Sequence, residues 1–119
     1  KMWRILQIEH IDAVEHLEEI VQVDGIDAYI VGPNDLSGSV GHIRCVTHPD
    51  MMPIYDRIGE VMKKYNKLFG VSMGFVPEVI DQWLARGARI VFAGNDAGYV
   101  HDGAVNVLHG LHERVTLLN

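Results

Sequence analysis

Four short apolar runs divide the chain, and each one ends in polar or glycine-containing sequence. They cover residues 3–8, 26–31, 68–73 and 88–93. The runs are rich in β-branched and aromatic residues, which is the composition of short buried strands. The pattern therefore predicts four β-strands.

Segments with the apolar spacing of helices follow these runs. The predicted helices span residues 11–23, 49–66, 77–86 and about 101–118. In the first, apolar side chains at positions 11, 14, 17, 20 and 21 form one stripe. Pro77 opens the third and Gly87 follows it, the usual asymmetry of helix ends. Gly103 and Gly110 weaken the helical pattern of the fourth.

The alternation of strands and helices predicts an α/β fold with a parallel sheet covered by helices. A (β/α)8 barrel requires about 250 residues, whereas an open four-stranded sheet leaves two unpaired edges. Four βα units therefore form either a small open domain or half of a barrel. We expect residues 1–119 to form a single partial domain, because no linker interrupts them and the first apolar run begins without a lead-in.

Composition narrows the possible partners and the compartment. The 119 residues include 10 Lys and Arg against 16 Asp and Glu, a net charge of −6. Because acids are in excess and basic residues do not cluster, nucleic acid is not an expected partner. No apolar stretch reaches the roughly 20 residues of a membrane span, and no secretory signal is visible. A single cysteine, Cys45, excludes an internal disulfide framework and indicates a cytoplasmic, reducing location.

Two acidic residues directly follow the first two predicted strands. Ligands of α/β folds bind at the carboxyl ends of parallel strands, so Glu9 and Asp35 occupy equivalent places there. Neighbouring carboxylates repel each other unless a proton or cation lies between them, and Mg²⁺ suits one or two such ligands. Alternatively, Glu9 caps a helix and Asp35 is a turn residue. Spacing alone leaves both interpretations open.

The segment after the second strand is predicted to be a loop. Gly32 permits close approach of the backbone to a ligand. The amides of Asn34, Asp35 and Leu36 are placed to form a small anion-binding turn. A tight loop without a ligand accounts for the same residues equally well.

Several motifs together resemble the HpcH/HpaI aldolase family, the metal-dependent (class II) 2-oxo-acid aldolases related to citrate lyase β-type enzymes. The motifs are Gln7-Ile8-Glu9, Gly25-Ile26-Asp27-Ala28, the string from Gly32 to Gly41, His48-Pro49 and the segment from Gly87 to Asp96. The resemblance covers essentially the whole chain but only the carboxyl-terminal half of the family's barrel.

The resemblance implies a site, a cofactor and a reaction. It makes Glu9 and Asp35 the ligands of Mg²⁺ or Mn²⁺, which chelates the keto and carboxylate oxygens of pyruvate or a related 2-oxo acid. The implied substrate-binding residues are Gly32, Pro33, Asn34, Asp35 and Ser72. The implied substrates are 4-hydroxy-2-oxo acids, such as 2-keto-3-deoxy sugar acids, which are cleaved to pyruvate and an aldehyde. The implied assembly is a homo-oligomer in which the last helix is swapped between subunits.

The chain departs from the family pattern at several positions. His10 stands where the family usually has threonine, and it either supports Glu9 or lies exposed. Ser72 replaces an aliphatic residue of the pyruvate site, and residues 41–46 depart from the usual loop. The family's substrate arginine and histidine base come from the first half of the barrel. We therefore expect these 119 residues alone to lack aldolase activity.

Other polar residues give weaker signals. His109 and His112 have i, i+3 spacing, which is more typical of a solvated helix face than of a metal site. Asp102 is expected to cap the last helix. His42 and His48 show no ligand spacing.

Two other functions remain open from the residues. One is a lyase acting on a CoA thioester such as citryl- or malyl-CoA. The other is a non-catalytic α/β module that binds an anion or a partner protein.

Overall fold

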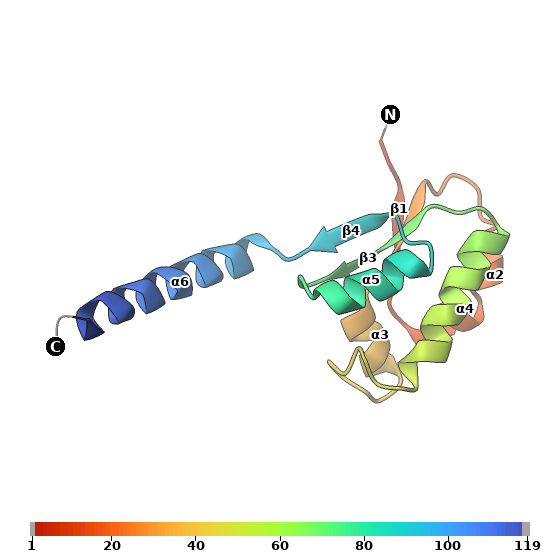
Figure 1. The fold of residues 1–119 in the computed structure, drawn as a ribbon. Helices are drawn as coiled ribbons and strands as arrows, with labels where there is room; N and C mark the ends of the chain where they lie inside the picture. Colours follow the sequence, from red (N-terminus) through yellow and green to blue (C-terminus); the bar gives the residue numbers. More distant parts are fainter. Residues whose placement is uncertain (1, 118–119) are drawn as a thin grey trace.

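The computed structural model describes residues 2–117, and its centre is a parallel four-stranded sheet (Figure 1). The strands are β1 (Ile5–Ile8), β2 (Ala28–Val31), β3 (Phe69–Met73) and β4 (Ile90–Ala93). They lie in the order β1-β2-β3-β4, so each strand pairs with its neighbour in sequence. This is the arrangement of consecutive units in a (β/α)8 barrel. The prediction of an α/β fold with four βα units is confirmed.

Helices connect and follow these strands. They are α1 (Ile11–Glu15), α2 (Leu17–Ile20), α3 (Pro33–Ser39), α4 (Met51–Lys64), α5 (Pro77–Ala85) and α6 (Asp96–Thr116). The predicted helices 49–66 and 77–86 correspond to α4 and α5 within two residues at each end. Their apolar stripes account for this agreement, because each stripe faces the sheet.

One face of the sheet packs against α1, α2, α4 and α5 to form the core. Ile8, Val31 and Val71 are aligned by the strand register and are fully buried there. The rings of Tyr55 on α4 and Trp83 on α5 meet at 4.5 Å between centroids. Burial of such aromatic and branched side chains supplies most of the stabilisation.

The opposite face of the sheet is not covered by these helices. Because side chains alternate along a strand, Gln7, Ser72 and Phe92 project from this face. Phe92 remains 47% exposed, and Ile5 on β1 is 45% exposed. In a closed barrel the same face lines the interior.

Gly70 allows β3 and β4 to approach each other closely. A Cβ at this position would overlap the carbonyl oxygen of Ile90 and lie 2.5 Å from its Cβ. A side chain at Gly70 is therefore incompatible with the observed strand pairing.

The prediction of one continuous helix over residues 11–23 is wrong. The structure has two short helices, α1 and α2, which meet at His16. The backbone N–H of His16 donates to Asp12 and Val14 carbonyls, closing α1 before the chain turns into α2. The apolar stripe continues from α1 into α2, because Val14 and Leu17 are both buried.

The segment predicted as a loop after β2 is instead the helix α3. Pro33 occupies its first turn, where proline's fixed φ suits a helix. Leu36 is fully buried and anchors the helix on the core. Ser37 is fully buried, and its hydroxyl is paired because it donates to the carbonyl of Asn34 at 2.8 Å.

The last helix begins earlier than predicted. Asn95 caps α6 by accepting a hydrogen bond from the backbone N–H of Gly98 at 2.8 Å, so the expected cap at Asp102 is wrong. Helix α6 continues through Gly103 and Gly110. Its predicted end at residue 118 lies outside the described residues.

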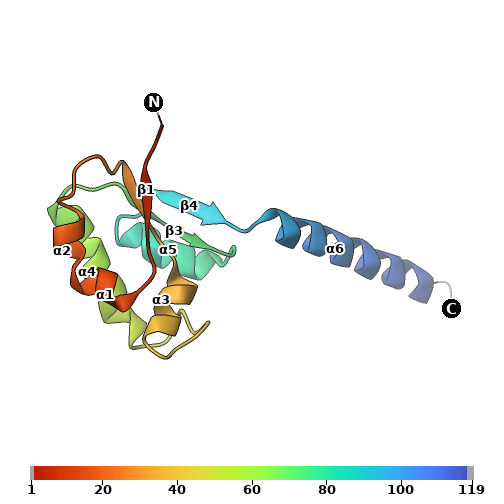
Figure 2. The same ribbon diagram turned by 180° about the vertical axis from the view of Figure 1, so that it is seen from behind.

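Helix α6 extends away from the sheet and its other helices, as both ribbon views show (Figures 1 and 2). None of its described side chains is buried. Val107, Leu108 and Leu111 are 64%, 50% and 58% exposed. Within residues 2–117, no helix has the length and apolarity needed to cross a membrane.

Candidate functional site

A cavity of about 260 Å³ lies at the carboxyl edge of the sheet, where the chain leaves the strands. It is lined by Gln7, Gly32, Asn34, Asp35, Ser72, Met73, Gly74, Gly94 and Asn95. All four strand ends contribute to this set. The structure therefore brings together Gly32, Asn34, Asp35 and Ser72, four of the predicted substrate-binding residues, whereas Pro33 is buried and does not line the cavity.

Glu9 follows β1 immediately and is exposed, but it is not among the residues that line this cavity. The amide Nε2 of Gln7 donates to Oε2 of Glu9 at 2.6 Å. Because Gln7 also lines the cavity, this bond ties the Glu9 carboxylate to the same edge. Such a donor orients a carboxylate without neutralising its charge.

Gly32 forms the contact between the ends of β1 and β2. Its N–H donates to the carbonyl of Ile8 at 3.0 Å. A Cβ at Gly32 would lie 3.0 Å from Nε2 of Gln7 and 3.1 Å from Oε2 of Glu9. The φ of Gly32 is −101°, an angle open to any residue. A side chain at Gly32 would therefore crowd Gln7 and Glu9, and glycine lets the Glu9 carboxylate approach the second strand.

Asp35 lies in the first turn of α3, where the helix dipole favours a negative charge. Within residues 2–117, its carboxylate makes no hydrogen bond or ion pair. The predicted anion-binding turn needs one correction, because the N–H of Leu36 donates to the carbonyl of Gly32 at 3.0 Å. The amides of Asn34 and Asp35 are the first-turn donors that remain.

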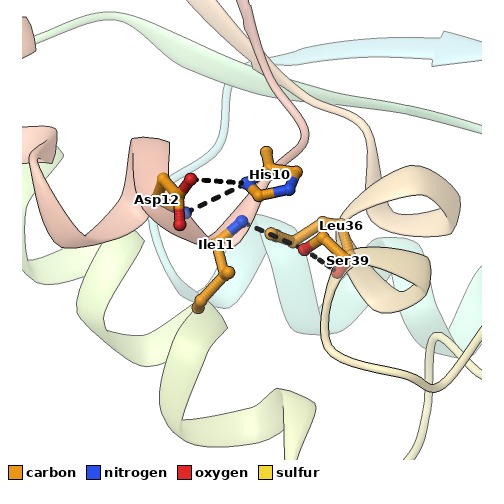
Figure 3. Close-up of polar contacts among 5 residues, drawn as sticks. All are labelled: His10, Ile11, Asp12, Leu36 and Ser39. Atoms are coloured by element: carbon orange, nitrogen blue, oxygen red, sulfur yellow. Dashed lines mark hydrogen bonds and ion pairs between the residues drawn. The ribbon is translucent and has the colours of Figure 1, made fainter.

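A serine links the segments that carry the two acids (Figure 3). The N–H of Ile11, two residues after Glu9, donates to Oγ of Ser39 at 3.0 Å. The same hydroxyl donates to the carbonyl of Leu36 at 2.7 Å. Ser39 therefore fixes the chain after β1 against the helix that presents Asp35.

His10 has a local structural role rather than the supporting contact with Glu9 that the sequence left open. It is the N-cap of α1, and its Nδ1 accepts a hydrogen bond from the N–H of Asp12 at 3.3 Å (Figure 3). The same nitrogen lies 3.4 Å from Oδ2 of Asp12. Capping by this side chain satisfies an amide that the first turn leaves free.

The sequence pattern alone assigns no role to Gln7, Ser39 or Asn95. Gln7 was recognisable, because it lies two positions before Glu9 and alternation places both on one face of the strand. Asn95 follows β4 directly, as Glu9 follows β1. Ser39 gave no comparable signal, since its partner Ile11 is 28 residues away in sequence.

The donor set at this edge suits a hard divalent cation. Glu9 and Asp35 offer exposed carboxylate oxygens, and Asn34 and Asn95 line the same cavity. Mg²⁺ and Mn²⁺ bind such oxygen ligands and retain water or substrate oxygens in the rest of their shell. An open, polar cavity leaves room for both.

Similarity to known proteins extends over most of the chain. Residues 2–102 match the profile of the HpcH/HpaI aldolase/citrate lyase family. A 2-dehydro-3,6-dideoxy-6-sulfogluconate aldolase from Pseudomonas putida is 34% identical over 92% of this chain and 43% of its own length. A 2-keto-3-deoxy-L-rhamnonate aldolase from Escherichia coli is 36% identical over 77% of this chain and 34% of its own length.

Solved structures agree with this relationship. An HpcH/HpaI aldolase from Desulfitobacterium hafniense superposes with a TM-score of 0.83 at 26% identity, over 93% of this chain and 43% of its own. The chain thus spans less than half the length of the relatives it matches, and its four βα units correspond to the carboxyl-terminal half of a (β/α)8 barrel. The chain belongs to the HpcH/HpaI aldolase/citrate lyase family.

Proposed function

We propose that this chain provides the metal-binding half of a class II aldolase that cleaves 4-hydroxy-2-oxo acids, such as 2-keto-3-deoxy sugar acids, to pyruvate and an aldehyde. Glu9 and Asp35 hold Mg²⁺ or Mn²⁺ in this proposal. The observation that carries it is that Asp35, Gly32 and Gln7 line one polar cavity, and that Gln7 holds the carboxylate of Glu9 by a hydrogen bond. The two aldolase relatives, whose names describe cleavage of related sugar acids, support the choice of substrate class.

The residues of the chain have separate tasks in this proposal. Gln7 fixes one oxygen of Glu9 through their 2.6 Å hydrogen bond, so that the carboxylate keeps one orientation. The first-turn amides of Asn34 and Asp35 bind the substrate carboxylate, because a helix N-terminus attracts anions. Ser72 contributes a hydroxyl to the cavity wall. When bound, the metal supplies Lewis acidity that stabilises negative charge on the 2-oxo acid as the carbon–carbon bond breaks.

Binding measurements on the 119-residue chain test the proposal without requiring turnover. We expect Mn²⁺ and oxamate, an analogue of pyruvate, each to tighten binding of the other in isothermal titration. Glu9→Gln and Asp35→Asn should both abolish this coupling, while a folded variant such as His109→Ala retains it. Independent binding of the two ligands would instead support the non-catalytic anion-binding alternative.

Turnover is a separate test, made in a complete barrel that contains this half. We expect metal-dependent cleavage of 4-hydroxy-2-oxo acids and no reaction with citryl- or malyl-CoA. We expect the 119 residues alone to bind ligands without turnover, because the family's arginine and histidine base belong to the other half. Near-normal activity of Glu9→Gln at saturating Mn²⁺ would reject the proposal.

The proposal includes a homo-oligomer held together partly by α6. Leu108, Leu111 and Val115, which is 57% exposed, give the helix an exposed apolar surface. Burial of this surface against another subunit would be favourable. Light scattering should show an oligomer that Leu111→Glu dissociates. The exposed polar change Asn106→Asp is the matched control on the same helix.

A further inference from the structure

Two histidines and an aspartate converge in the segment between α3 and α4, outside the cavity described above. Nε2 of His42 lies 3.0 Å from Oδ2 of Asp50, and Nδ1 of His48 lies 3.6 Å from the same oxygen. The two imidazole rings stack with 3.7 Å between centroids and 16° between planes. One ligand atom from each residue lies within 4.8 Å of the others.

Backbone hydrogen bonds hold this segment in place. The N–H of His42 donates to the carbonyl of Ser37 at 2.8 Å. The N–H of Cys45 donates to His42, and that of His48 donates to Cys45, at 2.8 and 2.9 Å. Both histidines are half-buried, so neither extends freely into solvent. A preorganised set of ligands loses less conformational entropy when it binds an ion.

The side chain of Asp50 does not cap α4, although Asp50 occupies the N-cap position. It is the N-cap residue of α4, where aspartate normally accepts a hydrogen bond from the first helical turn. Its side chain makes no such bond. Instead, a single oxygen is directed to nitrogens of both His42 and His48. The carboxylate therefore lies at the edge of the stacked pair, within 3.6 Å of a nitrogen of each ring.

We propose that His42, His48 and Asp50 form a site for a borderline divalent ion, with Zn²⁺ as the leading candidate. Two imidazole nitrogens and one carboxylate oxygen form a common zinc ligand set, with water as the fourth ligand. Imidazole favours Zn²⁺, Co²⁺ and Ni²⁺ over Mg²⁺. This site therefore differs in chemistry from the all-oxygen set of Glu9 and Asp35.

Ion binding requires one change in the observed side chains. Nitrogen lone pairs lie in the plane of an imidazole, so two stacked rings cannot both direct a lone pair at one ion. Rotation of His42 about its side-chain torsions removes the stacking and leaves the backbone hydrogen bonds intact. Rotation of His48 also breaks the 3.3 Å hydrogen bond that its Nδ1 accepts from the N–H of Asp50, which frees this nitrogen for the ion. The ion then lies between the imidazole nitrogens and Oδ2 of Asp50, where it replaces their direct contacts.

The location gives the site a regulatory consequence. Ile43 and Arg44 directly follow His42 and line a hollow of about 620 Å³ together with Asn34 and Asp35. An ion bound by His42, His48 and Asp50 restrains this segment at both ends. Zinc binding thus fixes one wall of the space beside Asp35.

Zinc titration of the 119-residue chain tests the site, with excess Mg²⁺ present to occupy the carboxylate pair. We expect one Zn²⁺ to bind, with its affinity reduced at least tenfold by His42→Ala and by His48→Ala. The double change His109→Ala and His112→Ala on α6 is the matched control and should leave the affinity unchanged. Equal Zn²⁺ affinity in wild type and both single variants would overturn the proposal, as would loss of binding in the control.

A measurement on the unaltered chain covers the case in which a variant fails to fold. In NMR spectra, substoichiometric Zn²⁺ should shift the ring signals of His42 and His48 before those of His109 and His112. Shifts confined to the α6 histidines, or absent at all four, would contradict the site. Neither result depends on whether Glu9 and Asp35 bind Mn²⁺.

Discussion

Replacing Gly32 with alanine tests the close approach of the first two strands at the proposed metal site. The new methyl group would lie 3.1 Å from Oε2 of Glu9, whereas ordinary van der Waals contact begins near 3.4 Å. Glu9 or the backbone must therefore shift by about 0.3 Å. Metal–ligand distances tolerate only about 0.2 Å of change, so we expect Mn²⁺ affinity to fall about tenfold, or ~1.4 kcal/mol.

The matched control is Gly74→Ala in the same cavity. Gly74 also lines the cavity, but a Cβ there meets no atom within 4 Å and its φ is not in the left-handed region. We expect this variant to bind Mn²⁺ as wild type does. Electron paramagnetic resonance of free Mn²⁺ gives both dissociation constants, and circular dichroism verifies that both variants fold.

The outcome separates a metal site from a tight turn. Because φ of Gly32 is −101°, alanine adds no backbone strain and should change the free energy of unfolding by less than about 1 kcal/mol. Mn²⁺ affinity that is unchanged in Gly32→Ala, with the fold intact, would refute the placement of Glu9 as a ligand. Equal losses in both glycine variants would refute the steric reasoning.

Three further predictions concern the fold. Gly70→Ala should lower the free energy of unfolding by about 1–3 kcal/mol or prevent folding. The control Gly103→Ala on exposed α6 should not lower it. Urea titration measures both variants. Burial raises the pKa of Tyr55 from 10.0 to about 12. The free energy of unfolding should therefore be constant below pH 10 and fall by up to roughly 2.7 kcal/mol as the pH rises toward 12. Tyr55→Phe should lack this loss. Hydrogen bonds from Lys64 and Tyr65 lower the pKa of Glu18 below 4.5. Their contribution to the free energy of unfolding should therefore persist at neutral pH and disappear as the pH falls through that lowered pKa. In urea titrations, Glu18→Gln should lack this acid dependence.

The strands were predictable because buried parallel strands require nearly continuous apolar sequence. Each observed strand lies within its predicted run, as β1 (Ile5–Ile8) lies within residues 3–8. Helix α3 was not predictable from its own residues, because Gly38 and two serines disfavour a helix. Burial of Leu36 and the hydroxyl bonds of those serines outweigh this local preference.

The candidate site was partly predictable for a related reason. Residues directly after strands must lie at one edge of a parallel sheet, which brings Asp35 and Ser72 to one cavity. The contact of Ser39 with Ile11 depends on how α3 packs, and no periodic pattern encodes it. The cluster of His42, His48 and Asp50 likewise arises from the path of an irregular segment.

A crystal of the chain grown with Mn²⁺, with diffraction data collected at the manganese absorption edge, shows whether Glu9 and Asp35 share one ion. We predict an anomalous peak bound by one carboxylate oxygen of Glu9 and one of Asp35, each at about 2.1 Å. Side chains of these two residues that point apart, with no manganese between them, would contradict it.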